Sequence, residues 1–138
     1  MVPRCSSATG FAILSEMFSA AVLDHFRNPR NAGELPDATA TVEVSNPVCG
    51  DILKLSARIV GGRITEARFL CRGCTTSIAS ASILTEKLRG RTPAEARAIT
   101  AESISESLER LPPETLHGAQ LATDAVNALL QKLPSEIR

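Results

Sequence analysis

The hydrophobic positions of this chain change their spacing twice, from helical to strand-like and back to helical. In the first part, apolar side chains recur every three or four residues between Met17 and about Arg27, which predicts a short amphipathic helix. Pro29 is expected to end this helix. The polar stretch 31–37, which contains glycine and proline, predicts a loop before the next element.

Alternation of apolar and polar residues follows in three runs and predicts three strands. The runs cover residues 41–45, 53–59 and 66–69. The pair Gly61-Gly62 lies between the second and third runs and is typical of a two-residue hairpin turn. Another turn, at 46–51, joins the first run to the second. The runs therefore predict an antiparallel meander with one apolar and one polar face.

Helical spacing returns after the third run and continues almost to the end of the chain. It predicts a helix from about Thr75 to Leu88, which Gly90 ends. Two short helices over 93–99 and 101–110 come next, and then a long final amphipathic helix that Pro134 ends. The predicted fold class is therefore α+β, with a three-stranded antiparallel sheet covered by helices on one face.

Length and composition narrow the class of protein. The chain has 138 residues and shows no internal repeat and no long linker, so residues 17–138 are expected to form a single domain. Residues 1–16 are expected to be a tail without a function. The 15 Lys and Arg balance the 15 Asp and Glu, which argues against nucleic acid and anionic membranes as partners. No apolar run approaches the roughly 18–20 residues that span a bilayer.

The chain has four cysteines, Cys5, Cys49, Cys71 and Cys74, and its start shows no secretion signal. Disulfide frameworks are typical of small secreted chains, so we expect reduced thiols and a cytoplasmic localisation. In that compartment, clustered cysteine and histidine residues are more often metal ligands or reactive thiols than disulfides. Cys5 is expected to belong to the tail and to take no part in a site.

Three of the predicted turns and helix starts carry side chains that bind metals. Cys49 lies in a turn with Asp51 two residues further on, and Cys74 precedes a helix whose positive N-terminal end favours a thiolate. His117 lies near the start of the final helix. If these segments converge at one edge of the sheet, their thiols, carboxylate and imidazole suit zinc or an iron–sulfur cluster. The spacing also fits buried cysteines and a capping histidine.

Four longer segments make this pattern more specific. They are LDHFRNPRNAGEL at 23–35, NPVCGD at 46–51, GCTTSIASAS at 73–82 and LPPETLHGAQLATDA at 111–125. In order and in spacing, these segments resemble the signature segments of IscU/NifU-type iron–sulfur cluster assembly scaffold proteins. The resemblance extends from about Met17 to Leu133, and it implies an α+β fold of the predicted kind.

The resemblance also implies a function and a set of ligands. Scaffolds of this family take iron, and persulfide sulfur from a cysteine desulfurase, hold a transient [2Fe–2S] cluster and pass it to apo-proteins. They are carriers rather than enzymes. The family's ligands match Cys49, Asp51, Cys74 and His117, and zinc is an alternative metal for the same group.

The sequence departs from the family's pattern at two places near His117. The family's third cysteine, which receives persulfide, falls on Gly118, which offers no ligand atom. Because glycine costs little at a helix edge, we expect a cysteine at position 118 to be tolerated. Glu114 and Thr115 stand where chaperone-recruiting members have valine and lysine, which argues against the usual chaperone hand-off.

Cys71 forms a Cys-x-x-Cys pattern with Cys74, and its interpretation stays open. Strand alternation places Cys71 on the apolar face, as a buried core thiol. A bend at Gly73 would instead bring it to the site as an extra ligand or sulfur acceptor. The small hydroxyl residues at 75–82 likewise permit two interpretations, close helix packing or hydrogen bonds to cluster sulfides. His25 is expected to pack rather than to bind metal.

Two other functions compete with that of a scaffold. A divergent accessory protein with the same fold would bind zinc or regulate the desulfurase without building clusters. A thiol oxidoreductase that uses Cys71 and Cys74 is less favoured, because the βαβ pattern expected around such a redox motif is missing.

Overall fold

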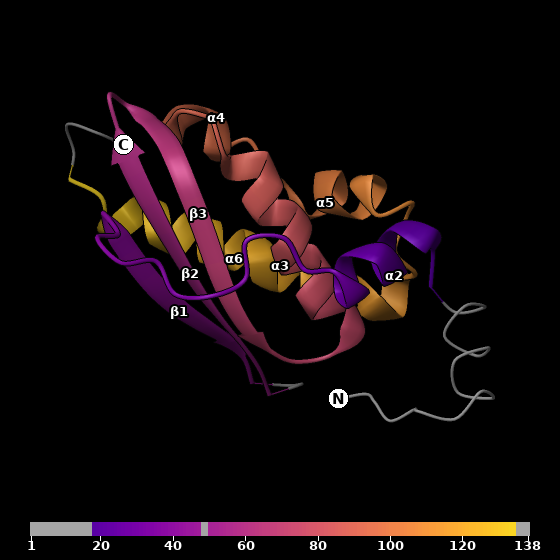
Figure 1. The fold of residues 1–138 in the computed structure, drawn as a ribbon. Helices are drawn as coiled ribbons and strands as arrows, with labels where there is room; N and C mark the ends of the chain where they lie inside the picture. Colours follow the sequence, from indigo (N-terminus) through magenta and orange to yellow (C-terminus); the bar gives the residue numbers. More distant parts are fainter. Residues whose placement is uncertain (1–17, 48–49, 135–138) are drawn as a thin grey trace.

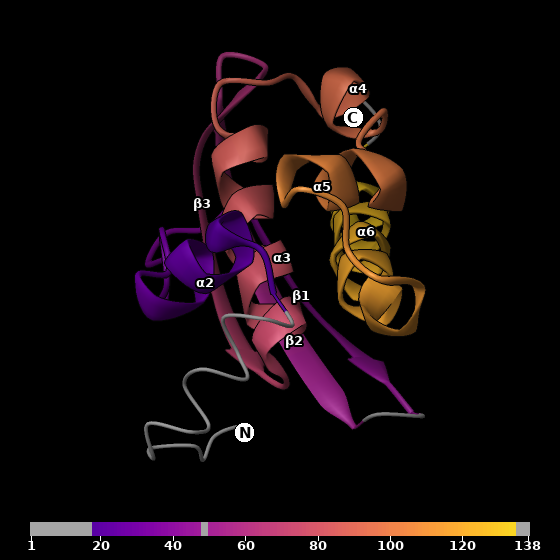
Figure 2. The same ribbon diagram turned by 90° about the vertical axis from the view of Figure 1, so that its right-hand side faces the viewer.

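The sheet and the helices form two layers. The structure is a computed structural model that describes residues 18–47 and 50–134. Figures 1 and 2 show the helices gathered against one face of a three-stranded sheet. The elements are, in chain order, α2 (Ala20–Arg27), β1 (Ala40–Asn46), β2 (Asp51–Val60), β3 (Arg63–Arg72), α3 (Thr75–Leu88), α4 (Pro93–Ala96), α5 (Ala101–Ser107), the 3-10 turn η1 (Pro113–Thr115) and α6 (Leu116–Lys132). The predicted α+β class is confirmed.

The sheet is the predicted antiparallel meander, with the strand order β1-β2-β3. Gly61 and Gly62 make the turn between β2 and β3 with φ values of +62° and +80°, which glycine adopts without strain. Leu55 of β2 lies opposite Val42 of β1 and Phe69 of β3, and all three side chains are buried in the core. Alternation along the strands therefore places one apolar face against the helices.

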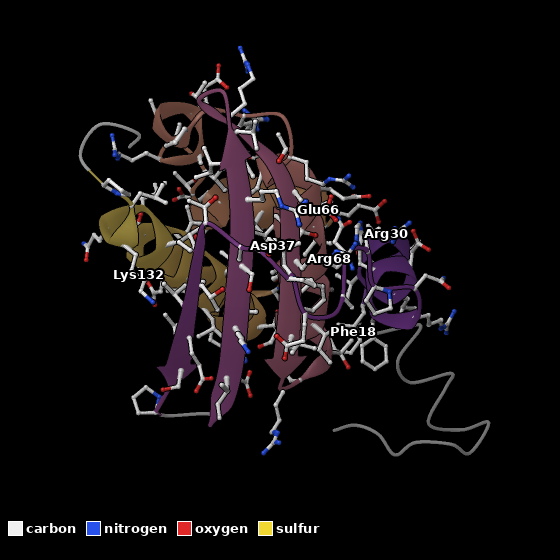
Figure 3. All side chains as sticks on the ribbon, turned by 60° about the vertical axis from the view of Figure 1, so that its left-hand side comes forward. Phe18, Arg30, Asp37, Glu66, Arg68 and Lys132 are labelled. Atoms are coloured by element: carbon white, nitrogen blue, oxygen red, sulfur yellow. The ribbon has the colours of Figure 1, made fainter. Side chains whose placement is uncertain are left out.

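Both edges of the sheet are partly capped. The loop before β1 runs along the edge of β3, where Gly33 donates its N–H to the carbonyl of Phe69 at 2.8 Å. At the other edge, the ammonium group of Lys132 on α6 donates to the carbonyl of Thr41 at 2.7 Å, and Figure 3 shows Lys132 beside that edge. Capped edges offer fewer free backbone groups to another chain.

The helix α3 lies at the centre of the helical layer and has the predicted bounds. It packs against α2, α6 and β3. Its first two turns bury mostly alanine, serine and threonine side chains, which let the neighbouring elements approach closely. Gly90 follows the helix with a φ of +88°. Close packing of α3, one of the two interpretations of its composition, is therefore observed.

Three other helices differ from the prediction at their ends. The helix α2 begins after its N-cap Ser19, while the predicted start at Met17 lies outside the described residues. The helix α4 ends at Ala96. The helix α5 ends at Ser107, because the chain turns away through two left-handed residues. These residues are Glu109 and Arg110, with φ values of +63° and +70°.

None of the helices in the described part of the chain has the length and apolar character needed to cross a membrane.

Candidate metal centre

Three of the predicted ligands meet at one end of the sheet. Asp51 is the first residue of β2, Cys74 is the N-cap of α3, and His117 lies in the first turn of α6. One ligand atom from each residue lies within 4.8 Å of the other two. The turns and helix starts that carry these three residues therefore converge, as the prediction of a metal site required. Cys49 lies outside the described residues, and its place in the group stays a prediction.

The sulfur of Cys74 lies close to both other ligand atoms. Its Sγ is 3.4 Å from Nε2 of His117 and 3.6 Å from Oδ2 of Asp51. The same Oδ2 is 3.9 Å from Nε2 of His117. A thiol, an imidazole and a carboxylate are thus close enough to bind one ion together, and this mixed set of donors fits zinc and iron.

The backbone at Gly73 makes room for the carboxylate of Asp51. A Cβ atom at position 73 would lie 2.7 Å from Cγ of Asp51, which is too close for two carbon atoms. The absence of a side chain therefore lets the carboxylate lie against the residue that precedes Cys74. Glycine at position 73 therefore leaves the space that the Asp51 carboxylate occupies.

One side of the group is open to solvent. The side chain of His117 is 28% exposed, whereas that of Asp51 is 8% exposed. Carboxylate and imidazole are harder ligands than thiolate, so this set suits an ion that is bound and later released.

Two hydroxyl groups of α3 lie beside the Cys74 sulfur. Oγ1 of Thr76 is 3.2 Å from Sγ, and Oγ of Ser77 is 3.3 Å from it. Ser77 also donates a hydrogen bond of 2.5 Å to Oδ2 of Asp51. Hydroxyl donors along 75–82 were one of the two expectations from the sequence, but nothing in the sequence distinguished Ser77 from the others. The available signal, a hydroxyl residue near the start of a helix, occurs in many helices that have no metal nearby.

Cys71 is not among the residues whose ligand atoms form the group. Its thiol is half-buried against the hydrophobic core, and it lies opposite Leu53 in the sheet. Burial raises the pKa of the Cys71 thiol to about 12, and the charges of Asp51 and Cys74 add to the increase. A thiol with such a pKa is protonated at neutral pH, which favours the core interpretation. A role as an extra ligand or sulfur acceptor stays a prediction.

Gly118 is buried where α6 touches the first turn of α3. A Cβ atom at position 118 would lie 2.9 Å from the backbone nitrogen of Ser77 and 2.9 Å from the carbonyl carbon and oxygen of Thr76. Backbone atoms cannot move aside as the end of a flexible side chain can. This contact argues against the expectation that a cysteine would be tolerated at position 118, because that expectation considered helix propensity and not the distance between the two helices.

The second histidine of the described chain is part of the packing. His25 is buried between α2 and α3, and its Nδ1 lies 2.7 Å from Oγ of Ser82. Its other ring nitrogen lies 3.7 Å from a carboxylate oxygen of Glu86. Neither contact involves a cysteine. This agrees with the expectation that His25 packs rather than binds metal.

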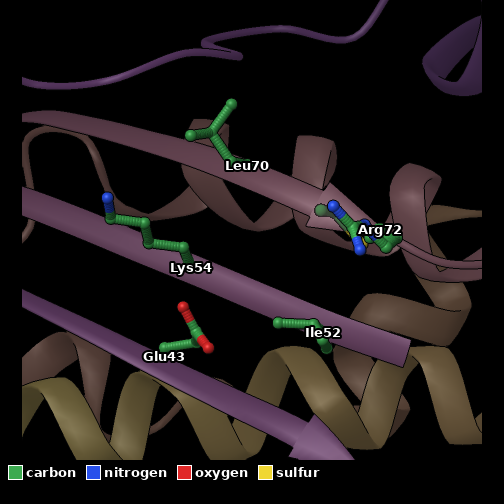
Figure 4. Close-up of a pocket in the computed structure, with 6 residues that line it drawn as sticks. Glu43, Ile52, Lys54, Leu70 and Arg72 are labelled. Atoms are coloured by element: carbon green, nitrogen blue, oxygen red, sulfur yellow. The ribbon is translucent and has the colours of Figure 1, made fainter. Parts of the chain in front are cut away.

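A shallow hollow of about 400 Å³ lies on the opposite, outer face of the sheet (Figure 4). The side chains of Ile52, Lys54, Leu70 and Arg72 border it. None of the three grouped ligands lines this hollow, so it does not belong to the metal centre.

The fold and the ligand group together define a class of protein. This class is a small α+β domain that carries a mixed sulfur, nitrogen and oxygen site at one end of a three-stranded meander. The sequence model of the family described as "NifU-like N terminal domain" matches residues 17–137. The chain belongs to this family.

Individual relatives agree with the family match. The chain is 41% identical over 110 residues to "Iron-sulfur cluster assembly scaffold protein IscU 1" of Archaeoglobus fulgidus, a match that covers 80% of this chain and 72% of the relative. It is 40% identical over 123 residues to "Iron-sulfur cluster assembly scaffold protein IscU" of Escherichia coli, covering 86% of this chain and 95% of the relative.

Solved structures agree with the fold. A putative iron–sulfur cluster assembly scaffold protein for the SUF system from Fervidobacterium islandicum superposes with a TM-score of 0.73 at 22% identity, over 83% of this chain and 97% of the other. A nitrogen-fixing NifU-like protein (N-terminal) from Brucella abortus superposes with a TM-score of 0.71 at 18% identity, over 86% and 95%. At these identities the likeness concerns the fold alone.

Proposed function

We propose that this chain is an iron–sulfur cluster assembly scaffold. It receives iron and sulfur, holds them as a transient [2Fe–2S] cluster, and passes the cluster to apo-proteins. The observation that carries the proposal is the meeting of Asp51, Cys74 and His117 at the end of the sheet. The curated relatives of Archaeoglobus fulgidus and Escherichia coli carry the same function in their names.

Each ligand has a distinct part in this function. Cys74, together with Cys49, supplies the sulfur donors that hold iron most firmly. Asp51 and His117 supply an oxygen and a nitrogen donor, which release iron more readily than thiolate does. The exposed side of His117 is where cargo enters and leaves. Zinc binds to the same donors when iron is absent.

The proposed function requires particular partners. A cysteine desulfurase supplies the sulfur, and apo-proteins that need a cluster accept the product. The chain acts as a carrier in the cytoplasm and not as an enzyme, with residues 17–138 as one working domain. Neither nucleic acid nor a membrane takes part, and Glu114 and Thr115 argue against a chaperone hand-off.

Anaerobic reconstitution tests the proposal. The purified chain is incubated with ferrous iron, cysteine, a cysteine desulfurase and a thiol reductant, and then separated from the small molecules. A scaffold retains visible absorption and about two irons and two sulfides per chain, and transfers them to an apo-ferredoxin. Cys74→Ala is the matched variant, since it removes one sulfur ligand from the site.

The competing function gives a different result in the same experiment. An accessory protein that only binds zinc stays colourless, retains one zinc ion per chain and transfers nothing. That outcome would contradict the scaffold function, whatever the protein does to the activity of the desulfurase.

A further inference from the structure

Ser77 contacts two of the three grouped ligands. Its Oγ lies 2.5 Å from Oδ2 of Asp51 and 3.3 Å from Sγ of Cys74. Ser77 and Asp51 are both buried, so water competes little for this hydrogen bond. Neither the family match nor the names of the relatives assigns a role to this residue.

The proton of the Ser77 hydroxyl goes to Asp51. A serine hydroxyl has a single proton to donate, and the bond to the carboxylate is the shorter of its two contacts. Hydrogen bonds from a hydroxyl to a charged carboxylate are short and strong, because the acceptor is ionised. The hydroxyl proton of Thr76, 3.2 Å from the same sulfur, is therefore the one available to Cys74.

The oxygen that Ser77 holds is the one that faces the other ligands. Oδ2 of Asp51 is the carboxylate oxygen 3.6 Å from the Cys74 sulfur and 3.9 Å from Nε2 of His117. The carboxylate also lies against Gly73, where a Cβ atom would collide with it. Gly73 thus leaves room for the Asp51 carboxylate, and the hydrogen bond from Ser77 holds its Oδ2 toward Cys74 and His117.

The position of Ser77 is itself fixed by the contact between two helices. The backbone nitrogen of Ser77 lies beneath Gly118, where α6 comes too close to α3 for a side chain. The residue next to Gly118 is His117, so the same contact sets the imidazole and the serine hydroxyl relative to each other.

We propose that Ser77 is a positioning residue for metal binding, which holds the Asp51 carboxylate toward Cys74 and His117. This inference rests on the proposed function, because it concerns the same group of ligands. A carboxylate that is already turned toward the metal position loses little freedom when the ion binds. Hydrogen-bond partners of metal ligands typically contribute about 10- to 100-fold to metal affinity.

The first test compares Ser77→Ala with Ser80→Ala, using Co²⁺ as the added ion. Ser80 lies nearly one turn further along α3, is fully buried, and its hydroxyl has no hydrogen-bond partner among the described residues. Both changes remove one buried hydroxyl from the same helix. Affinity is measured by competition with a chelator, and the sulfur-to-cobalt charge-transfer absorption reports that a thiolate binds the ion.

We expect Ser77→Ala to weaken Co²⁺ binding about tenfold while Ser80→Ala leaves it unchanged. Alanine favours helices, so both variants should keep the fold, which thermal unfolding monitors. Wild-type affinity in Ser77→Ala, or equal losses in the two variants, would overturn the positioning role alone. If the wild-type chain bound Co²⁺ without thiolate absorption, the proposed function would fail as well.

A double-mutant cycle with Asp51→Asn separates positioning from a general structural effect. If Ser77 acts through Asp51, then Ser77→Ala should cause little further loss of Co²⁺ affinity once Asp51→Asn has removed the carboxylate. A full tenfold loss in both backgrounds would show that Ser77 acts by another route, and it would contradict the proposal.

Discussion

The two histidines of this protein both lie against residues of α3 or its N-cap but occupy different surroundings. His117, on α6, faces the start of α3, where its Nε2 is 3.4 Å from the Cys74 sulfur, and its side chain is 28% exposed. His25, on α2, faces a later turn of α3, where its Nδ1 is 2.7 Å from the Ser82 hydroxyl, and its side chain is 8% exposed. Each also has a carboxylate within 4 Å, namely Asp51 at 3.9 Å and Glu86 at 3.7 Å.

The comparison shows what separates a candidate ligand from a packing residue. A histidine, a hydroxyl and a carboxylate occur in both regions, so these groups do not by themselves indicate a metal site. The thiol of Cys74 and the opening to solvent occur only at the His117 end of the two. A soft ligand and a route for exchange are what a carrier of iron needs.

Removal of the thiol should have the largest effect, because it makes the two regions chemically alike. We expect Cys74→Ala to abolish stable binding of iron or of a cluster, while the fold remains. Cys74 makes no side-chain capping bond to α3, so little helix stability should be lost. Metal content after reconstitution measures the effect, with circular dichroism as the control for folding. An unchanged number of metal ions per chain would show that Cys74 is not a ligand.

Replacing each histidine in turn should produce opposite results. His117→Ala should weaken Co²⁺ binding at least tenfold and change stability little, because its ring is partly exposed. His25→Ala should leave Co²⁺ binding unchanged and lower the free energy of unfolding by about 1–3 kcal/mol, because it removes a buried partner of Ser82. Chelator competition and urea unfolding measure the two quantities, and equal effects of the two changes would invalidate the distinction.

A cysteine at position 118 tests the packing beside the ligands. Gly118→Cys should lower the free energy of unfolding by about 1–3 kcal/mol, because its Cβ must push α6 away from the backbone of α3. The shift should also reduce metal affinity, since His117 moves with α6. Urea unfolding and Co²⁺ titration measure both. A variant with wild-type stability and tighter metal binding would show that the helices separate easily and that the sequence expectation was correct.

The pH dependence of stability should report the buried histidine. Burial lowers the pKa of His25 below its usual value of 6.5, and the charge of Arg30 adds to this, while Glu86 and Asp24 oppose it. As the pH falls below about 6.5, the unfolded chain takes up this proton before the folded chain does. The stability contribution of His25 is thus complete above that pH and is lost as the pH falls through the folded pKa.

We therefore expect the free energy of unfolding to decrease from about pH 7.5 to about pH 5.5. His25→Gln should reduce this decrease, because glutamine does not titrate in this range. Urea unfolding at several pH values measures the slope. An equal slope in the variant and the wild type would mean that other groups carry the pH dependence.

Deletion of residues 1–16 should have the smallest effect. The family match begins at residue 17, so we expect unchanged metal binding and unchanged thermal stability. Loss of metal or a large fall in melting temperature would show that the deleted segment belongs to the working domain.

Local patterns were sufficient to predict most of the fold. The strand alternation, the Gly61-Gly62 turn and the helix Thr75–Leu88 are all confirmed, because each depends on residues that are close in sequence. Membership of the IscU/NifU family is confirmed as well. The end of α5 was predicted too late, since Glu109 and Arg110 are not residues that usually mark a left-handed turn.

Contacts between distant segments could not be predicted in the same way. The meeting of Asp51, Cys74 and His117 followed from the order of turns and helix starts only under the condition that these ends converge. The contact of Gly118 with the α3 backbone depends on the distance between two helices, about which a single glycine carries no information. The hydrogen bond from Ser77 to Asp51 was missed for the same reason.

X-ray absorption of the zinc-loaded protein tests the central claim, that the ion binds at the His117 end, most directly. With Cys49 and Cys74 as sulfur ligands and Asp51 and His117 as the others, we predict two sulfur neighbours at about 2.3 Å and two nitrogen or oxygen neighbours at about 2.0–2.1 Å. Cys74→Ala should abolish zinc binding or leave the ion with one sulfur neighbour fewer, and His25→Ala should change nothing. A set of zinc neighbours that Cys74→Ala leaves unchanged, or that His25→Ala alters, would contradict the claim that the ion binds at the His117 end.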